Sequence, residues 1–162
     1  MYFSVTRNTK KVAQKIAENL KSDILEIEPK HEYTSDDIDY SNDNCRANKE
    51  MKDKKARPEI ANDLSKVDSC DKVYIGYPVW WGTAPRIIQT FIENYNLEGK
   101  KIYIFCTSGG SGVEQSISDL KGYFPKLDIA NGYRFDSDAS EDNISKGLEQ
   151  LNNDGMAELW KR

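Results

Sequence analysis

The sequence predicts an α/β protein in which a parallel β-sheet lies between two layers of helices. Two segments, 73–77 and 102–106, are continuous apolar runs that end at turn-forming residues. Continuous runs are typical of strands that are covered on both faces, as in parallel sheets. Apolar residues with helical spacing alternate with the strands, and this alternation predicts right-handed crossovers with helices on both faces. The length of 162 residues corresponds to one domain, 1–162.

Shorter patterns along the chain predict the remaining elements. Apolar residues at 2–3 and 24–27 are further strand candidates, and a fifth strand begins at 127–129. Four helices are predicted from apolar residues that recur with the period of one helix face. Their apolar stripes are Val12–Leu20, Ile87–Tyr95, Val113–Leu120 and Ile144–Leu151. Pro85 favours the start of the second of these helices, because proline fits a first helical turn.

Residues 29–59 interrupt this alternation, and we call them the excursion. They carry many charges and few large apolar side chains, so they form either a surface layer or a partly disordered segment. The middle of the excursion, 42–55, is predicted to form a polar helix capped by Asn42 or Asp43. A short helix is then predicted before the next strand, from the spacing of Ile60, Leu64 and Val67.

Composition and charge exclude several classes of function. Charged residues form 31% of the chain and the net charge is -4, so we expect no nucleic-acid-binding surface. The sequence contains neither a run of about 18 apolar residues nor a secretory signal pattern, so we expect no membrane span and a cytoplasmic location. The only histidine, His31, is expected at the surface, which leaves little for a metal site. The cysteines form no CxxC pair and are expected to be reduced thiols: Cys45, Cys70 and Cys106.

The C-terminal tail, after Gly155, contains a last group of apolar residues. Their helical spacing predicts a docked final turn rather than a contact with a cofactor. The residues concerned are Met156, Leu159 and Trp160.

The loop that follows the first predicted strand, residues 4–9, is rich in hydrogen-bond donors. It reads Ser-Val-Thr-Arg-Asn-Thr and leads directly into a predicted helix. Its three hydroxyls, one side-chain amide and the free backbone N–H groups of a helix start suit a phosphate group. The same residue types also cap helices, so a purely structural interpretation stays open for this loop taken alone.

Two more loops follow the third and fourth predicted strands. Residues 77–85 contain the adjacent Trp80 and Trp81 between two prolines, and both indoles cannot enter the same core face. At least one of them is therefore expected to line a surface or a flat aromatic ligand; the alternative is that both only pack within the protein. Residues 107–112 have no bulky side chain, so the backbone there can approach a ligand closely. In a parallel sheet, ligands bind at the edge where these loops meet.

These motifs carry a family resemblance. The segment YFSVTRNTKKVA, residues 2–13, resembles the phosphate loop and following helix of flavodoxins. YPVWWGTAP, 77–85, and CTSGGSG, 106–112, are similar to the flavin-contacting loops of bacterial flavodoxin-like proteins. The segment 40–58 also resembles the inserted region of this group, to which we assign no role. The resemblance implies a flavodoxin-like three-layer sandwich with a five-stranded parallel sheet in the order 2-1-3-4-5, and bound FMN.

The resemblance also implies which residues bind the FMN. One of the two tryptophans is the expected aromatic partner of the flavin ring. The phosphate would be bound by Ser4, Thr6, Asn8 and Thr9, the isoalloxazine would be bordered by Pro78, Val79, Trp80, Trp81 and Gly82, and the loop on its other side comprises Thr107, Ser108, Gly109 and Gly110.

Arg7 stands where this family usually has glycine. If the position requires a positive φ, an arginine strains the loop. If it does not, the guanidinium adds a charge-assisted contact to the phosphate, so Arg7 is included among the candidate FMN-binding residues.

The function that the resemblance implies is electron transfer through bound FMN between redox partner proteins, by a monomer that needs no catalytic side chain. One alternative is an FMN-dependent NAD(P)H:quinone-type oxidoreductase, in which the excursion roofs a substrate pocket. The other alternative is a non-redox binding domain on the same fold. Whether the protein is an enzyme is therefore left open, with the electron carrier favoured.

Overall fold

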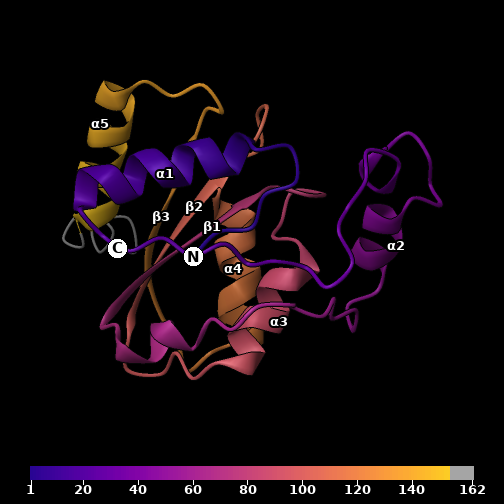
Figure 1. Cartoon of the computed structure of the whole chain (residues 1–162), viewed down its shortest axis with the longest axis horizontal. Helices are drawn as coiled ribbons and strands as arrows, with labels where there is room; N and C mark the ends of the chain where they lie inside the picture. The colour runs from indigo at the N-terminus through magenta and orange to yellow at the C-terminus, as the bar shows by residue number, and fades with distance from the viewer. Residues whose placement is uncertain (154–162) are drawn as a thin grey trace.

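A computed structural model describes residues 1–153 of the chain. Its centre is a parallel sheet of three strands, in the order β1, β2, β3. Helices α1 and α5 lie on one face of this sheet, and α3 and α4 on the other (Figure 1). The strands are β1 (Lys72–Pro78), β2 (Lys101–Thr107) and β3 (Asp128–Phe135). The helices are α1 (Asn8–Leu20), α2 (Arg46–Lys52), α3 (Arg86–Asn94), α4 (Glu114–Tyr123) and α5 (Glu141–Asn152).

Two hydrophobic cores explain this layered arrangement. The apolar stripe of α1, with Val12 and Ile16, packs with that of α5 and with Phe105 on one face of the sheet. On the other face, the α3 residues Ile87 and Ile88 belong to a core that also contains apolar side chains of β1 and β2. Because β2 is buried along almost its whole length, its continuous apolar pattern is the one that a central parallel strand requires.

The expected five-stranded sheet is only partly present. Beyond β1, pairing continues through single parallel bridges, from Gly76 to Tyr2 and from Tyr2 to Glu26. The supporting hydrogen bonds are donated by Phe3 N–H to Gly76 O, at 2.9 Å, and by Ile27 N–H to Tyr2 O, at 2.7 Å. Each of these segments pairs through isolated bridges only. The structure therefore confirms a parallel α/β sheet of three strands and does not confirm the order 2-1-3-4-5.

The four predicted helical stripes are confirmed as α1, α3, α4 and α5. The polar helix of the excursion is shorter than predicted and its cap is different. α2 covers only Arg46–Lys52, and the Sγ of Cys45 accepts the hydrogen bond from Asn48 N–H at 3.4 Å. The predicted cap residue Asn42 instead lies in the preceding turn, where its carbonyl accepts a hydrogen bond from Cys45 N–H at 2.9 Å.

The excursion forms a surface layer at one side of the molecule (Figure 1). It contains one turn of 3-10 helix, η1 (Asp36–Ile38), and a second such turn, η2 (Ser65–Ser69), replaces the short helix predicted after it. Arg86 of α3 is buried and anchors α2, because its Nη2 donates to Met51 O at 2.9 Å and its Nε to Glu50 O at 3.3 Å.

None of the described helices has both the length and the apolarity of a membrane span. The predicted docked turn with Met156, Leu159 and Trp160 lies outside the described residues.

Candidate functional site

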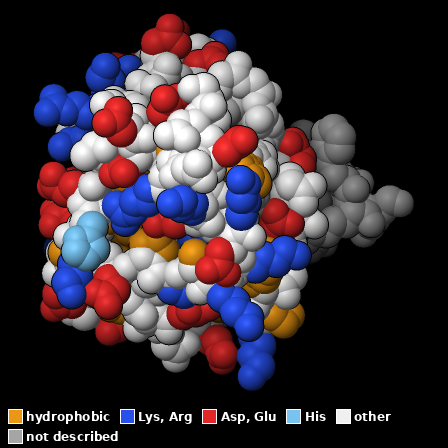
Figure 2. All heavy atoms as spheres, turned by 90° about the vertical axis from the view of Figure 1, so that its right-hand side faces the viewer, with side chains coloured by type: hydrophobic (Ala, Val, Ile, Leu, Met, Phe, Trp, Pro, Cys, Tyr) orange, Lys and Arg blue, Asp and Glu red, His pale blue; other side chains and the backbone are white. Residues whose placement is uncertain are grey.

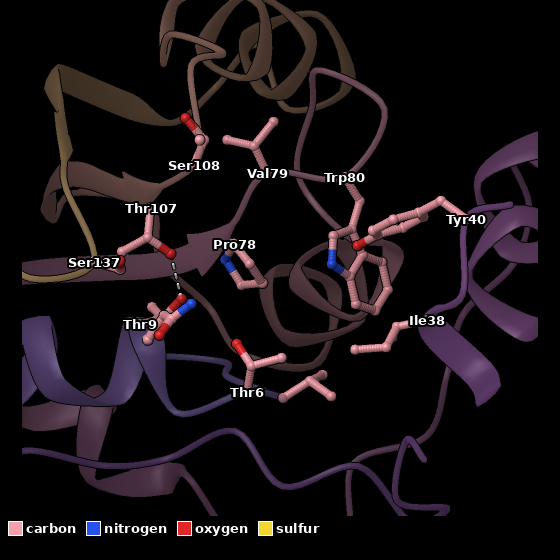
Figure 3. A pocket seen from close by; sticks show the side chains of 13 residues that line it. Thr6, Thr9, Ile38, Tyr40, Pro78, Val79, Trp80, Thr107, Ser108 and Ser137 are labelled. Carbon is pink, nitrogen blue, oxygen red and sulfur yellow. Dashed lines mark hydrogen bonds between the residues drawn. The ribbon is translucent and has the colours of Figure 1, made fainter. Parts of the chain in front are cut away.

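A cavity of about 370 Å³ opens beyond the carboxyl ends of β1 and β2 (Figure 3). The strand register brings its walls together, because Pro78 at the end of β1 pairs with Thr107 at the end of β2. Four segments that are distant in the sequence line the cavity together with one residue after β3. The lining residues are Val5, Thr6, Asn8, Thr9, Ile38, Tyr40, Pro78, Val79, Trp80, Thr107, Ser108, Gly109 and Ser137.

One end of the cavity is rich in hydroxyl groups. Thr9 and Thr107 are both buried, and their Oγ1 atoms share a hydrogen bond of 2.8 Å. Thr6 and Asn8 are exposed beside them. The first backbone N–H groups of α1 have no acceptor within the helix, and the Oγ of Ser4 satisfies that of Lys10 at 3.2 Å. The capping interpretation therefore fits Ser4, whereas Thr6, Asn8 and Thr9 line the cavity.

Arg7 has a left-handed backbone, with a φ of 70°. The backbone at this position therefore has the conformation that favours glycine, and a residue with a side chain is strained there. Of the two alternatives given for Arg7, a strained loop thus describes the residue better than a contact to the phosphate. Its side chain is exposed and does not line the cavity.

The two tryptophans have different environments. Trp80 is 3% exposed, and its ring packs edge-to-face against Phe3, at 5.6 Å between centroids, and Tyr33, at 5.3 Å. Trp80 also lines the cavity, whereas Trp81 lies outside it and is 52% exposed. The sequence could not distinguish the two indoles, since only the packing around each residue does so.

Trp81 and Gly82 form the centre of a tight two-residue turn. Trp80 N–H donates to Thr83 O at 2.9 Å, and Thr83 N–H donates to Trp80 O at 3.0 Å. Both central residues have positive φ, 52° for Trp81 and 74° for Gly82, as in a type I′ turn. This turn carries Trp81 and Gly82 away from the cavity that Trp80 lines.

The loop 107–112 is fixed at its second residue, Ser108. Arg134 of β3 donates from Nε to Ser108 Oγ at 2.9 Å and from Nη2 to Ser108 O at 2.8 Å, while it also pairs with Asp136 at 2.9 Å. Gly109 lines the cavity, and a Cβ atom added there would meet no protein atom within 4 Å. The loop thus leaves room for a ligand beside a well-anchored backbone.

The structure brings most of the sequence-predicted site residues into one cavity. It leaves five of them outside the lining: Ser4, Arg7, Trp81, Gly82 and Gly110.

Sequence reasoning missed four other lining residues: Val5, Ile38, Tyr40 and Ser137. Ser137 follows β3, and the rule that ligands lie beyond the carboxyl ends of strands applied to that loop too. Ile38 and Tyr40 come from the excursion, where no local pattern pointed to the cavity.

Among residues 1–153, no charged side chain lines the cavity. Cys106, just before Thr107, is buried, and this burial raises the pKa of its thiol to about 12 although Arg134 acts in the opposite direction. A thiolate nucleophile is therefore not available at this site near neutral pH. Within residues 1–153, no group of three or more His, Cys, Asp and Glu side chains is arranged to hold a metal ion.

The chemistry of the cavity walls fits a ligand with a flat ring and a phosphate. Thr9, Thr107 and Ser137 lie at one end, and Ile38, Tyr40 and Trp80 lie at the other (Figure 3). Hydroxyl and N–H donors suit an anion at the first end, and apolar and aromatic side chains suit a ring at the second.

Comparisons with known proteins agree with this description. A family model described as Flavodoxin matches residues 1–151. A Bacteroides eggerthii protein, inferred to be a flavoprotein, has a crystal structure that is 39% identical, with a TM-score of 0.87 over 93% of this chain and 94% of that chain. A Bacteroides uniformis protein with the same inferred role is 34% identical, with a TM-score of 0.88 over 91% of this chain and 94% of that chain. The crystal structure of a Lactobacillus acidophilus flavoprotein in complex with FMN is 26% identical, with a TM-score of 0.71 over 91% of this chain and 95% of that chain. No curated protein sequence matches the chain.

Proposed function

Because the chain belongs to the flavodoxin family, we propose that it binds FMN in the cavity beyond β1 and β2 and carries electrons between redox partner proteins. The observation that carries this proposal is the cavity itself, which joins the hydroxyl-rich start of α1 to the aromatic wall at Trp80. The FMN complex of the Lactobacillus acidophilus flavoprotein supports the choice of cofactor.

Each end of the cavity has a separate task in this proposal. Thr6, Asn8 and the N–H groups that begin α1 hold the phosphate, and the buried Thr9–Thr107 pair fixes the loop against β2. Pro78, Val79, Trp80, Ser108 and Gly109 border the ring. Bound FMN supplies the redox chemistry, and the protein supplies binding, orientation and exclusion of water.

An electron carrier agrees with the chemistry of the lining better than an enzyme does. Among residues 1–153, the lining includes no carboxylate, histidine, lysine or cysteine, and the phenol of Tyr40 is its one side chain of a type that serves as a general acid or base. Electron transfer needs none. We also propose that the protein acts as a monomer in the cytoplasm and meets its partners transiently.

One observation favours an FMN-dependent NAD(P)H:quinone-type oxidoreductase as a second candidate. The excursion contributes Ile38 and Tyr40 to the cavity wall, as a roof over a substrate pocket would. Fast oxidation of NADH or NADPH by the FMN-loaded protein with a quinone acceptor would favour this candidate. Reduction by NAD(P)H that stays slow, with fast exchange of electrons with a redox protein, would favour the carrier.

The direct test is the visible spectrum of the purified protein, with mass identification of any released cofactor and titration with FMN and riboflavin. We expect FMN to bind much more tightly than riboflavin, which lacks the phosphate. Asn8→Ala is expected to weaken FMN binding several-fold and to leave riboflavin binding unchanged. Asn19→Ala, at the other end of α1 and outside the cavity, is the matched control. A colourless protein that takes up neither flavin would instead support a non-redox binding domain.

A further inference from the structure

We propose that Tyr40, presented by the excursion, stacks on the FMN ring and forms a second aromatic wall of the site beside Trp80. This inference rests on the proposed function, because it concerns the same cavity. It gives the excursion a role in binding the cofactor rather than only in covering the surface.

Tyr40 lies at the ring end of the cavity. It lines the cavity together with Trp80 and Ile38, two residues after the η1 turn, and Figure 3 shows the three side chains at the end opposite Thr9 and Thr107. Among residues 1–153, Trp80 and Tyr40 are the two aromatic residues that line the cavity. A flat conjugated ring in this cavity therefore has aromatic surface available from two separate segments of the chain.

Trp80 and Tyr40 differ in how much of the side-chain surface is already buried within the protein. Trp80 is almost fully buried and its ring already packs on Phe3 and Tyr33. Tyr40 is 49% exposed. An exposed aromatic surface at the wall of a cavity can be covered by a ligand at no loss of existing packing. Trp80 thus provides a fixed wall, and Tyr40 provides surface that the ligand would bury.

The backbone of Tyr40 is held in place by one buried side chain. The Nδ2 of Asn48 in α2 donates to Tyr40 O at 3.2 Å and to Asn42 O at 3.0 Å. The Oδ1 of the same residue accepts the indole N–H of Trp81 at 2.7 Å. Asn48 therefore connects the segment that carries Tyr40 to the turn that follows Trp80, and Arg86 fixes the end of α2 to α3.

The charges on the outer surface of the excursion do not favour a charged docking surface there. They support instead a role for Tyr40 inside the cavity. On the side of the molecule where the excursion lies, basic and acidic side chains are mixed and hydrophobic side chains show between them (Figure 2). Such a face has no single sign of charge to attract one class of ligand. Tyr40 would therefore contribute to FMN binding through contact of its ring with the ligand inside the cavity.

The first test is the dissociation constant of FMN for the full-length protein and four variants, measured by calorimetry. Tyr40→Ala is expected to raise the constant about tenfold, which corresponds to about 1.4 kcal/mol. Tyr40→Phe keeps a ring and is expected to bind as the unchanged protein does, while Tyr40→Leu keeps bulk without a ring and is expected to lie between them. Tyr123→Ala removes a tyrosine of similar exposure, 43%, at the end of α4 outside the cavity and is expected to have no effect.

The second test uses flavin fluorescence, which electron-rich aromatic side chains quench on contact. In a Trp80→Phe background, adding Tyr40→Phe is expected to raise the emission of the FMN-saturated protein without weakening binding, because phenylalanine stacks but does not quench. A merely structural role of Tyr40 would not change this emission.

The results separate this inference from the proposed function. A protein that binds no FMN would overturn both. Tight FMN binding by the unchanged protein together with unchanged binding by Tyr40→Ala would overturn the role of Tyr40 alone. Equal losses in Tyr40→Ala and Tyr123→Ala, or equal binding by Tyr40→Leu and Tyr40→Phe, would also contradict stacking at position 40.

Discussion

The indole N–H of Trp81 donates a hydrogen bond of 2.7 Å to the side chain of Asn48, so the exposed tryptophan of the pair is tied to the excursion rather than to the cavity. Asn48 is 2% exposed and makes three side-chain hydrogen bonds in this region. One buried carboxamide therefore organises the turn at 80–83, the segment before α2 and α2 itself.

Asn48→Ala is expected to destabilise the protein by about 2 kcal/mol, because it leaves two backbone carbonyls without their donor. Urea unfolding monitored by circular dichroism measures this loss. Trp81→Phe removes only the indole bond and leaves the Oδ1 of Asn48 without its donor, so its expected cost is about 1 kcal/mol, smaller than that of Asn48→Ala. An Asn48→Ala variant no less stable than Trp81→Phe would show that Asn48 does not organise the region.

The hydroxyl pair of Thr9 and Thr107 is expected to behave as one unit in a double-mutant cycle. Thr9→Val leaves the buried hydroxyl of Thr107 without its 2.8 Å partner, which costs about 1–3 kcal/mol. Thr107→Val does the same to Thr9. The double variant removes both polar groups and is expected to cost clearly less than the sum of the two single changes. Strictly additive free energies of unfolding, measured without FMN, would contradict direct coupling between the two hydroxyls.

Arg7→Gly is expected to stabilise the protein. A residue with a side chain at a φ of 70° costs about 1–2 kcal/mol, and the larger backbone entropy of unfolded glycine offsets about 0.5–1 kcal/mol of the gain. The net expectation is a rise of a few degrees in Tm by thermal unfolding. Arg7→Ala removes the charge but keeps the Cβ atom, and it is expected to give no such rise. Equal Tm changes in the two variants would trace the effect to the charge instead of the backbone.

Stability is expected to fall at alkaline pH, in part because of Cys106. Burial raises the pKa of this thiol to about 12 in the folded protein, while an unfolded thiol titrates near about 8.5. The unfolded state therefore loses its proton first. The contribution of Cys106 to the free energy of unfolding is therefore complete below about pH 8.5, and it is lost as the pH rises toward 12.

The slope of the unfolding free energy against pH between about 9 and 10.5 measures this contribution, with a limit of about 1.4 kcal/mol per pH unit for one group. Cys106→Ala is expected to flatten the slope, whatever its effect on absolute stability. Cys70→Ala, at a half-buried position, is the comparison. Parallel curves for the Cys106 variant and the unchanged protein would rule out this thiol as the titrating group.

The sequence predicted the elements whose pattern is local. The apolar runs at 73–77 and 102–106 are the centres of β1 and β2, and the four helical stripes are helices. It also predicted that the loops after the first, third and fourth strand segments would meet, because parallel strands end at one edge. These loops do line one cavity, through Thr9, Trp80 and Thr107 among others.

The remaining features depend on tertiary contacts that no local pattern encodes. Tyr40 reaches the cavity because Asn48 and Arg86 anchor the excursion from elements far away in the sequence. Trp81 turns outward because it adopts the first central position of a type I′ turn, where asparagine or aspartate is the usual residue. Cys45 rather than Asn42 caps α2, because Asn42 belongs to the preceding turn.

The uncharged lining of the cavity determines how a bound phosphate would respond to ionic strength. A phosphate held by lysine or arginine loses affinity as added electrolyte screens the charges, with a Debye length of about 8 Å at physiological salt. Here the lining offers hydroxyls, an amide and helix-start N–H groups, whose dipoles act over the first turn of the helix and carry no full charge. Recognition of a phosphate at this site would therefore weaken less with added salt than recognition by lysine or arginine would, and it would depend more on how rigidly the loop at 4–9 is held.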